Sequence, residues 1–295
     1  MFDKLLRDLV ENIEEPVRDG AGRPALSLKE QLFCSTQKVY SQLSSRRAKS
    51  LYDNSKERGF LQKVPHSNSV NKFFNRTDIT PILHKLIALS SAPLKTIETD
   101  FAIDSSGFRT NHFNDYCKEK HGTQKIHKWL KAHVCCGTKT NIVSSVTITE
   151  EYGADSPQFS QLVNQTAKNG FTIKELSADK AYNSRENYET VAEHGGTAFI
   201  PFKDNATGKA RGSLLWKRMF HYFQFEKEMF LEHYHKRSNV ESTFNMIKAK
   251  FGDGVKSKNW TAQKNELLAK ILCHNIVVVI HEMFELGIEA KFESS

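Results

Sequence analysis

Near residue 97 the pattern of the chain changes, and this change limits the folds that the chain can adopt. Residues before it are polar with apolar positions at helical spacing, whereas short apolar and β-branched segments follow. The segments that predict strands are residues 100–104, 126–135, 142–149, 171–178 and 197–202. Helical patterns separate the third, fourth and fifth of them, and the rest of the chain is helical nearly to its end. This order predicts a mixed α/β sheet flanked by helices.

The first third of the chain predicts several short helices. Residues 27–51 form one predicted helix, opened by Ser27 as a capping residue. A second helix follows Pro65, with Ser67 or Asn68 as its cap, and a third begins near residue 78.

This helical part also contains the most basic segment of a chain whose formal net charge is +8. Between residues 36 and 78, nine lysines and arginines face three acidic residues. Short helices in a basic segment predict a DNA-binding region of the helix-turn-helix type in residues 1–95, and we expect Arg46, Arg47 and Lys49 to contact DNA. A plain helical bundle with a charged outer face is the alternative.

Other features bear on the compartment of the protein. Five cysteines without framework spacing favour a reducing interior. The start, Met1-Phe2-Asp3-Lys4, carries charges where a secretory signal would be apolar. The most apolar stretch, residues 276–280, is far shorter than the roughly 20 residues of a membrane span. We therefore expect no membrane segment and a cytoplasmic location.

Two aspartates fall where predicted strands end. Asp104 closes the first strand and Asp179 follows the fourth. If these strands are neighbours in the sheet, both carboxylates emerge at one edge and repel each other unless a cation joins them. Oxygen ligands of this kind suit Mg²⁺ or Mn²⁺. An ordinary aspartate at a strand end is the alternative for either residue alone.

A third acid, Glu241, lies in a segment with helical spacing. Tyr234 and Lys248 each lie seven residues from it, so at about 100° per residue all three share one side of a helix. Arg237 precedes Glu241 by four residues and lies beside this line. A separate apolar stripe faces the core, formed by Val240, Phe244, Ile247 and Phe251. The pattern indicates a metal-binding glutamate bracketed by phosphate-binding groups, against the alternative of a simple Arg–Glu helix pair.

These residues resemble the DDE transposases of prokaryotic insertion sequences. The signature Tyr-x2-Arg-x3-Glu-x6-Lys is complete in Tyr234, Arg237, Glu241 and Lys248, and the two aspartates precede it in the right order. Similar motifs surround the acids, at residues 103–107, 128–133, 178–182 and 267–275. Some relatives carry a long β-rich insertion before the glutamate, but here only 62 positions separate Asp179 from Glu241. Hairpin chemistry that relies on that insertion is not carried over.

The resemblance implies a ribonuclease H-like catalytic domain in residues 96–290 and metal-dependent phosphoryl transfer on DNA. Asp104, Asp179 and Glu241 would be the catalytic residues and would bind two Mg²⁺ ions, for which Mn²⁺ can substitute. Tyr234, Arg237 and Lys248 would contact DNA. The partners would be the inverted-repeat ends of the element and target DNA, with a dimer in the DNA complex, in the nucleoid of a prokaryotic cell.

Three alternatives remain open at this point. A nuclease of the same fold would cut DNA without joining it, and a regulator derived from a transposase would bind DNA without cutting. A zinc site is conceivable in a region crowded with ligand residues, although a strand with incidental histidines is favoured. That region contains His112, Cys117, His121, His127, His133, Cys135 and Cys136.

Overall fold

The computed structural model describes residues 1–16, 26–110 and 129–292. The described chain forms two compact units. Of the described residues, unit 1 contains 1–16, 26–93, 109–110 and 247–292, and unit 2 contains 94–108 and 129–246. The C-terminal helix therefore joins the N-terminal helices in unit 1. The division into a DNA-binding region over residues 1–95 and a catalytic domain over residues 96–290 stays a prediction about function.

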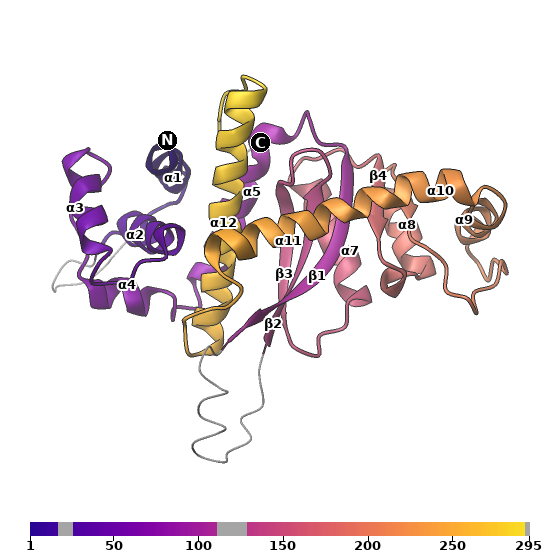
Figure 1. The fold of residues 1–295 in the computed structure, drawn as a ribbon, viewed down its shortest axis with the longest axis horizontal. Coiled ribbons are helices and arrows are strands. Elements are labelled where there is room, and N and C mark those ends of the chain that lie inside the picture. Colours follow the sequence, from indigo (N-terminus) through magenta and orange to yellow (C-terminus); the bar gives the residue numbers. More distant parts are fainter. Residues whose placement is uncertain (17–25, 111–128, 293–295) are drawn as a thin grey trace, which may run out of the picture. The chain divides into compact units, whose positions relative to one another are not determined.

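Unit 2 is built on a five-stranded sheet in the order β3-β2-β1-β4-β5 (Figure 1). Strands β2 and β3 are antiparallel, whereas β1 pairs with β4, and β4 with β5, in parallel. The sheet is mixed and flanked by helices, which confirms the predicted ribonuclease H-like fold class. Its strands are β1 (Asp100–Arg109), β2 (Trp129–Gly137), β3 (Val143–Glu150), β4 (Glu175–Ala178) and β5 (Thr197–Phe199).

Two helices join the later strands of this sheet. Helix α7 (Ser156–Lys168) begins after Asp155 with proline in its first turn, and its Phe159 is fully buried. Helix α8 (Arg185–Glu193) is capped by Ser184, whose hydroxyl accepts a hydrogen bond from the backbone N–H of Asn187 at 3.2 Å. Both helices lie between the strands that the helical patterns of the sequence separate.

Strand β1 is longer than predicted, and this is a correction. It continues through residues 105–107 instead of ending at Asp104. Gly107 of this extension lies next to Trp129, and a Cβ there would make an ordinary van der Waals contact with the Trp129 ring at 3.4 Å. At the far end, Arg109 donates its N–H to the carbonyl of Asp253 at 2.9 Å, which satisfies a backbone group that a free strand end would leave open.

The predicted helix around the third acid is interrupted. After α9 (Leu214–Phe225), α10 (Lys227–Tyr234) ends where a 3₁₀ turn, η3 (His235–Arg237), begins, and α11 (Ser238–Phe251) follows. A 3₁₀ turn has about 3.0 residues per turn, so it rotates Tyr234 away from the single line expected with Glu241. The apolar stripe is nevertheless confirmed, because all four of its residues are buried.

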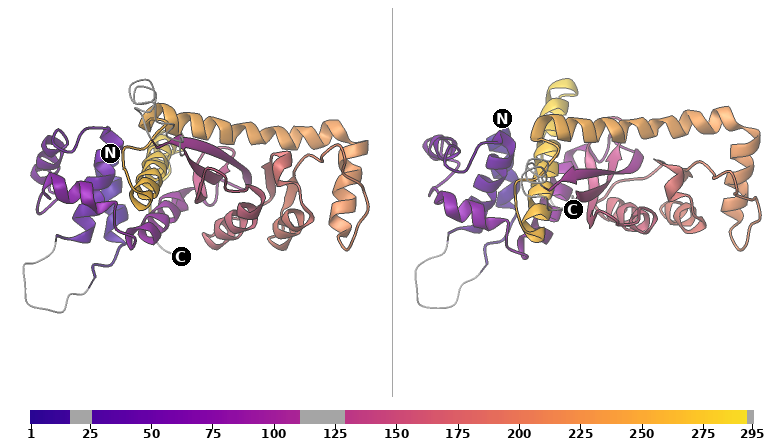
Figure 2. Two further views of the ribbon diagram at one scale, coloured as in Figure 1. Left: turned by 90° about the horizontal axis from the view of Figure 1, so that it is seen from below. Right: turned by 60° about the horizontal axis from the view of Figure 1, so that its bottom comes forward.

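Unit 1 is helical and combines both ends of the chain. The long helix α12 (Trp260–Glu285) packs against α5 (Ile79–Ser91), α2 (Leu28–Ser41) and α1 (Phe2–Glu11) (Figure 2). The remaining elements are α3 (Lys49–Glu57), α4 (Ser67–Phe73) and the 3₁₀ turn η1 (Ala92–Leu94). Helix α12 is long and apolar enough to cross a membrane, but 72% of its most apolar window is buried inside the protein, as in a core helix.

Two N-terminal details differ from prediction. The helix expected over residues 27–51 is two helices, because Gln42 adopts a left-handed conformation (φ 57°) and ends α2. The cap of α4 is His66, whose ring nitrogen accepts from the N–H of Asn68, instead of Ser67 or Asn68. Ser27 caps α2 as predicted, accepting the N–H of Glu30.

Candidate active site

Parallel pairing of β1 with β4 brings the two aspartates together. Ile103 lies opposite Ala178 in the ladder between these strands, so Asp104 and Asp179 occupy the next equivalent positions. Neighbouring strands lie about 4.8 Å apart, which puts both residues at the same edge of the sheet. Asp179 also begins the 3₁₀ turn η2 (Lys180–Tyr182), accepting the N–H of Lys180 at 2.6 Å.

The environment of Asp104 is that of a carboxylate crowded by other acids. Burial raises the pKa of its carboxyl, and the negative charges of Asp179 and Glu241 raise it further. The N–H of Ser105, which donates to Asp104 at 2.8 Å, and the charge of Arg237 act in the opposite direction. The charges of the other two predicted acids therefore both act on Asp104.

Arg237 joins the third acid to the first. One nitrogen of its guanidinium lies 2.6 Å from Oδ2 of Asp104, and another lies 2.5 Å from Oε1 of Glu241. The Arg–Glu pair weighed as an alternative thus exists, but the same arginine reaches a strand carboxylate as well. Burial lowers the pKa of Arg237, but Tyr234 and the two carboxylates raise it, and the net shift is upward. The expected phosphate-binding role of Arg237 stays a prediction.

The acids fit a divalent cation in their chemistry, because they are hard oxygen donors and the charges of Asp179 and Glu241 both reach Asp104. Across the described parts of the chain, no three His, Cys, Asp or Glu side chains lie close enough to hold a metal ion together. Glu241 is half exposed and turned to Arg237. For Glu241 to join Asp104 and Asp179 around one ion, its pair with Arg237 has to open.

A second charged cluster, which the sequence patterns did not indicate, anchors the 3₁₀ turn. Lys236 Nζ lies 2.7 Å from Asp100 and 2.7 Å from Glu175, two acids that face each other across β1 and β4. Glu175 also pairs with Nδ1 of His233 at 2.9 Å. Lys236 thereby offsets the repulsion of a cross-strand acid pair. Because Lys236 directly precedes Arg237, the same contacts anchor the turn that carries Arg237. Only its place beside the signature arginine could have drawn attention to it.

Another unpredicted group lies close to the aspartates. The hydroxyl of Tyr182 in η2 is buried, and its pKa is raised by burial and then by the charges of Asp155, Asp104 and Asp179. Asp155 in turn pairs with Lys131 at 2.8 Å and lies 3.2 Å from the buried His133. Polar groups therefore continue from the aspartates into the interior of unit 2.

The other residues of the signature are placed less closely around the acids. Tyr234 is half buried against the core of unit 2, and its ring centre lies 5.9 Å from the guanidinium carbon of Arg237. Lys248 lies two helical turns beyond Glu241 on α11, and burial lowers its pKa. Their contacts with DNA stay predictions.

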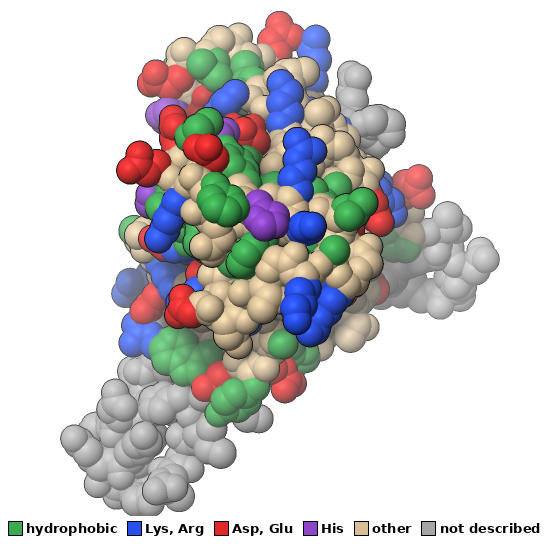
Figure 3. Space-filling view, turned by 90° about the vertical axis from the view of Figure 1, so that its right-hand side faces the viewer, with side chains coloured by type: hydrophobic (Ala, Val, Ile, Leu, Met, Phe, Trp, Pro, Cys, Tyr) green, Lys and Arg blue, Asp and Glu red, His purple; other side chains and the backbone are tan. Residues whose placement is uncertain are grey.

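Exposed basic residues occur in both units. Arg46, Arg47 and Lys49 are exposed at the start of α3, where Lys49 pairs with Asp53 at 3.0 Å. In unit 2, Lys217 and Arg218 of α9 are exposed, and Figure 3 shows lysines and arginines interspersed with hydrophobic side chains on one face. The prediction of DNA contacts by the three N-terminal residues stays a prediction.

The zinc alternative gains no support from the residues that can be placed. His112, Cys117, His121 and His127 lie outside the described residues. His133, Cys135 and Cys136 are buried in β2, and His133 bonds to Thr149 at 2.8 Å. Burial lowers the pKa of His133 to about 4 and raises the pKa of both cysteines, so in β2 these side chains are neutral interior residues.

Comparisons with known proteins give a family. A family model described as "Transposase DDE domain" matches residues 95–276, more than half of the chain and the part that contains all three acids. A cryo-EM structure of a piggyBac transposase synaptic complex with hairpin DNA is similar over 98% of this chain and 73% of that chain, with 10% identity and a TM-score of 0.44. This degree of likeness supports no argument about function.

Proposed function

Since the chain belongs to the transposase DDE domain family, we propose that it cuts DNA at the ends of an insertion sequence and joins the freed 3′-hydroxyl ends to target DNA. The single observation behind the assignment of the site is the convergence of three acids. Asp104 and Asp179 occupy equivalent positions directly after the paired residues Ile103 and Ala178 of two parallel strands. Glu241 contacts the same arginine, Arg237, as Asp104 does.

In this proposal Asp104, Asp179 and Glu241 hold divalent metal ions. Members of the family generally depend on such ions, and Mg²⁺, with Mn²⁺ as a substitute, matches the oxygen donors here. When bound, the ions would supply Lewis-acid stabilisation of the phosphate and activation of the attacking oxygen. Burial and the neighbouring acids disfavour the ionised form of Asp104. Positive charge beside its carboxylate has the opposite effect and favours that form.

The chain's other contribution is positioning. Arg237 leaves Glu241 and binds a phosphate of the DNA end, for which its planar guanidinium is suited. Lys248 and Tyr234 hold neighbouring backbone groups. No residue attacks the phosphate to form a covalent enzyme–DNA intermediate, so catalysis comes from orientation and charge. The partners are the inverted-repeat ends and target DNA, bound by a dimer in the nucleoid of a prokaryotic cell.

The test is removal of each acid's charge. We expect Asp104→Asn, Asp179→Asn and Glu241→Gln each to reduce cleavage of end DNA by about 1,000-fold or more, because loss of a metal ligand removes transition-state stabilisation. DNA affinity should change less than about twofold. Asp204→Asn, at an exposed loop acid, is the matched control. Cleavage at the normal rate by Glu241→Gln would exclude this site.

The same preparation separates the competing functions. Pre-cut end DNA with a free 3′-hydroxyl is mixed with target DNA, and joined products are measured. A transposase joins them, a nuclease of the same fold cuts intact ends but joins nothing, and a DNA-binding regulator does neither. Joined products that persist after mutation of all three acids would contradict the proposal.

A further inference from the structure

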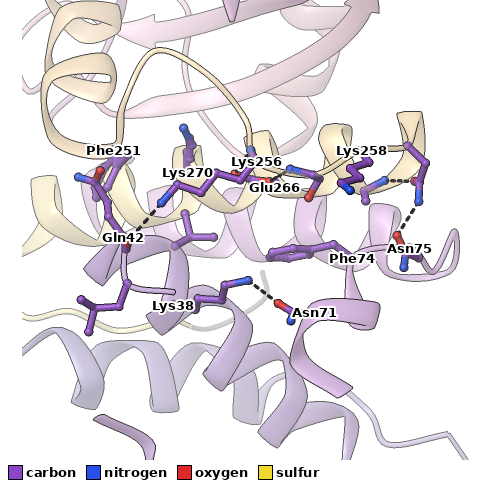
Figure 4. A pocket seen from close by; sticks show the side chains of 15 residues that line it. Lys38, Gln42, Asn71, Phe74, Asn75, Phe251, Lys256, Lys258, Glu266 and Lys270 are labelled. Carbon is purple, nitrogen blue, oxygen red and sulfur yellow. Dashed lines mark hydrogen bonds between the residues drawn. The ribbon is translucent and has the colours of Figure 1, made fainter. Parts of the chain in front are cut away.

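Unit 1 contains a cavity of about 510 Å³ that plays no part in the site described above. It lies between α2, the end of α4, the chain that follows α11 and the first turns of α12, all within this unit. Figure 4 shows Lys256, Lys258 and Lys270 along one wall, and Lys38 and Phe74 along the facing wall. A volume of this size accommodates a small polar ligand or one unit of a polymer.

Positive charge dominates the lining. Four lysines, Lys38, Lys256, Lys258 and Lys270, face the cavity with one carboxylate, Glu266. The carboxylate is already engaged, because its two oxygens accept the backbone N–H groups of Lys256 at 2.9 Å and of Ser257 at 2.8 Å. The lining therefore has more cations than it can balance by itself.

The hydrogen bonds of the lysines point to the same imbalance. Lys38 donates to the amide oxygen of Asn71 at 2.9 Å, and Lys256 donates to the carbonyl of Gln42 at 3.0 Å. Lys270 donates to the carbonyls of Gly252 and Gly254 at 3.0 and 2.5 Å. Within the described chain none of the four forms an ion pair with a carboxylate, so the partners of these three lysines are uncharged oxygens.

The burial and crowding of these ammonium groups lower the pKa of two of them. Burial lowers the pKa of Lys38 and lowers that of Lys270 to about 8, and in each case the charge of Lys256 lowers it further while that of Glu266 raises it. An anion in the cavity would oppose both effects by compensating the positive charges.

The rest of the lining is suited to a nucleotide unit. Side-chain amides of Gln42, Asn71, Asn75 and Asn259 line the cavity, each with at least one atom already hydrogen-bonded within the protein, and Val39, Phe74 and Phe251 provide apolar surface. Phosphate contacts in protein–DNA complexes come from this combination of lysines and amides.

We propose that this cavity binds the phosphodiester backbone of DNA, with Lys38, Lys256 and Lys258 contacting phosphate and Lys270 fixing the loop that carries two of them. The proposal rests on the proposed function in that DNA is the substrate. It assigns to unit 1 a binding site outside the acids and outside Arg46, Arg47 and Lys49. Such contacts add affinity without reading sequence.

The test uses the full chain and a random-sequence duplex, with binding followed by fluorescence anisotropy at several salt concentrations. Lys256→Gln combined with Lys258→Gln removes two exposed charges and leaves the core intact. We expect affinity to fall on the order of tenfold near 100 mM salt, and the slope of log affinity against log salt to become shallower by about two. Conversion of both residues to arginine should restore binding.

The matched control is Lys4→Gln combined with Lys168→Gln, which changes the net charge equally at two exposed lysines that do not line the cavity. If the cavity variant binds DNA and responds to salt as this control does, the proposal is wrong.

A second experiment measures the thermal stabilisation of the protein by inorganic phosphate. If it is lost in the cavity variant while DNA affinity is kept, the cavity takes free phosphate and the DNA assignment fails. Absence of DNA binding by the wild-type chain would instead overturn the proposed function.

Discussion

At the residue scale, the charge balance of the active site depends on Arg237. Its guanidinium contacts Asp104 and Glu241 together, so one cation compensates two acids that would otherwise repel each other. Its planar guanidinium presents a separate nitrogen to each carboxylate, whereas a lysine would have to meet both with one ammonium group. The sequence indicated the i,i+4 contact of Arg237 with Glu241. The contact of Arg237 with Asp104 joins residues that are 133 positions apart in the sequence, so it depends on the tertiary fold.

A single buried histidine gives a prediction about pH. His133 is fully buried, and its pKa of about 4 lies below the ordinary value of 6.5. A lowered histidine pKa means that the unfolded state binds the proton first as the pH falls. Stability is therefore present above about pH 6.5 and is lost as the pH falls toward 4, by about 3 kcal/mol from this group. Urea unfolding of the wild type and of His133→Gln at pH 7 and 4.5 measures it.

We expect the pH dependence of His133→Gln to be weaker than that of the wild type, since glutamine does not titrate. Asp155, 3.2 Å from the ring, and Lys131 oppose each other in their effect on this pKa. His84, whose pKa is also lowered to about 4, contributes to the pH dependence of stability in both proteins, so its contribution cancels when the two are compared. Equal pH slopes for the two proteins would contradict the assignment.

At the scale of elements, local signals placed helices well and turns poorly. Ser27 caps α2 as predicted, and Ser184 caps α8 in the same way, because capping is a contact within three residues. The break at Gln42 carries no glycine or proline signal, and the 3₁₀ turn His235–Arg237 continues a helical pattern. Lys236 could not be identified as an anchor, since its partners Asp100 and Glu175 are far away in sequence.

That anchor yields a prediction for the 3₁₀ turn. Lys236→Met removes the cation between Asp100 and Glu175 and leaves two acids facing each other across parallel strands. We expect a loss of stability of about 1–3 kcal/mol and a fall in the cleavage rate of about tenfold, because Arg237 is the last residue of the turn and Glu241 lies in the first turn of the helix that follows. Chemical denaturation and single-turnover cleavage measure the two effects.

A triple variant separates positioning from general destabilisation. Lys236→Met combined with Asp100→Asn and Glu175→Gln removes the repulsion together with the cation. If positioning by charge is the cause, stability should recover more than the cleavage rate does, since the neutral cluster no longer holds the turn. A Lys236→Met protein with normal stability and normal cleavage would show that the cluster is dispensable.

At the scale of the whole molecule, the sequence predicted the sheet but not the membership of unit 1. The alternation of strands and helices is local and fixes the fold class. Helix α12, by contrast, completes the N-terminal unit through contacts such as Asn265 Nδ2 with the carbonyl of Phe74 at 2.9 Å, 191 residues apart. No pattern within either segment shows that they belong together.

The composition of unit 1 therefore makes a prediction about fragments. A fragment of residues 1–93 lacks α12, against which α1, α2 and α5 pack. It would expose Leu83, Leu86 and Ile87, which are buried in the full chain, at a cost of about 1.5–3 kcal/mol for each side chain. A helical unit this small has little stability to lose, so we expect a protease-sensitive chain without a cooperative thermal transition.

The matched control protein joins residues 1–93 to 259–292 through a flexible linker and should regain cooperative unfolding, because it restores the helix that fills the core. Cooperative unfolding of residues 1–93 alone, followed by circular dichroism, would show instead that the N-terminal helices form an independent domain.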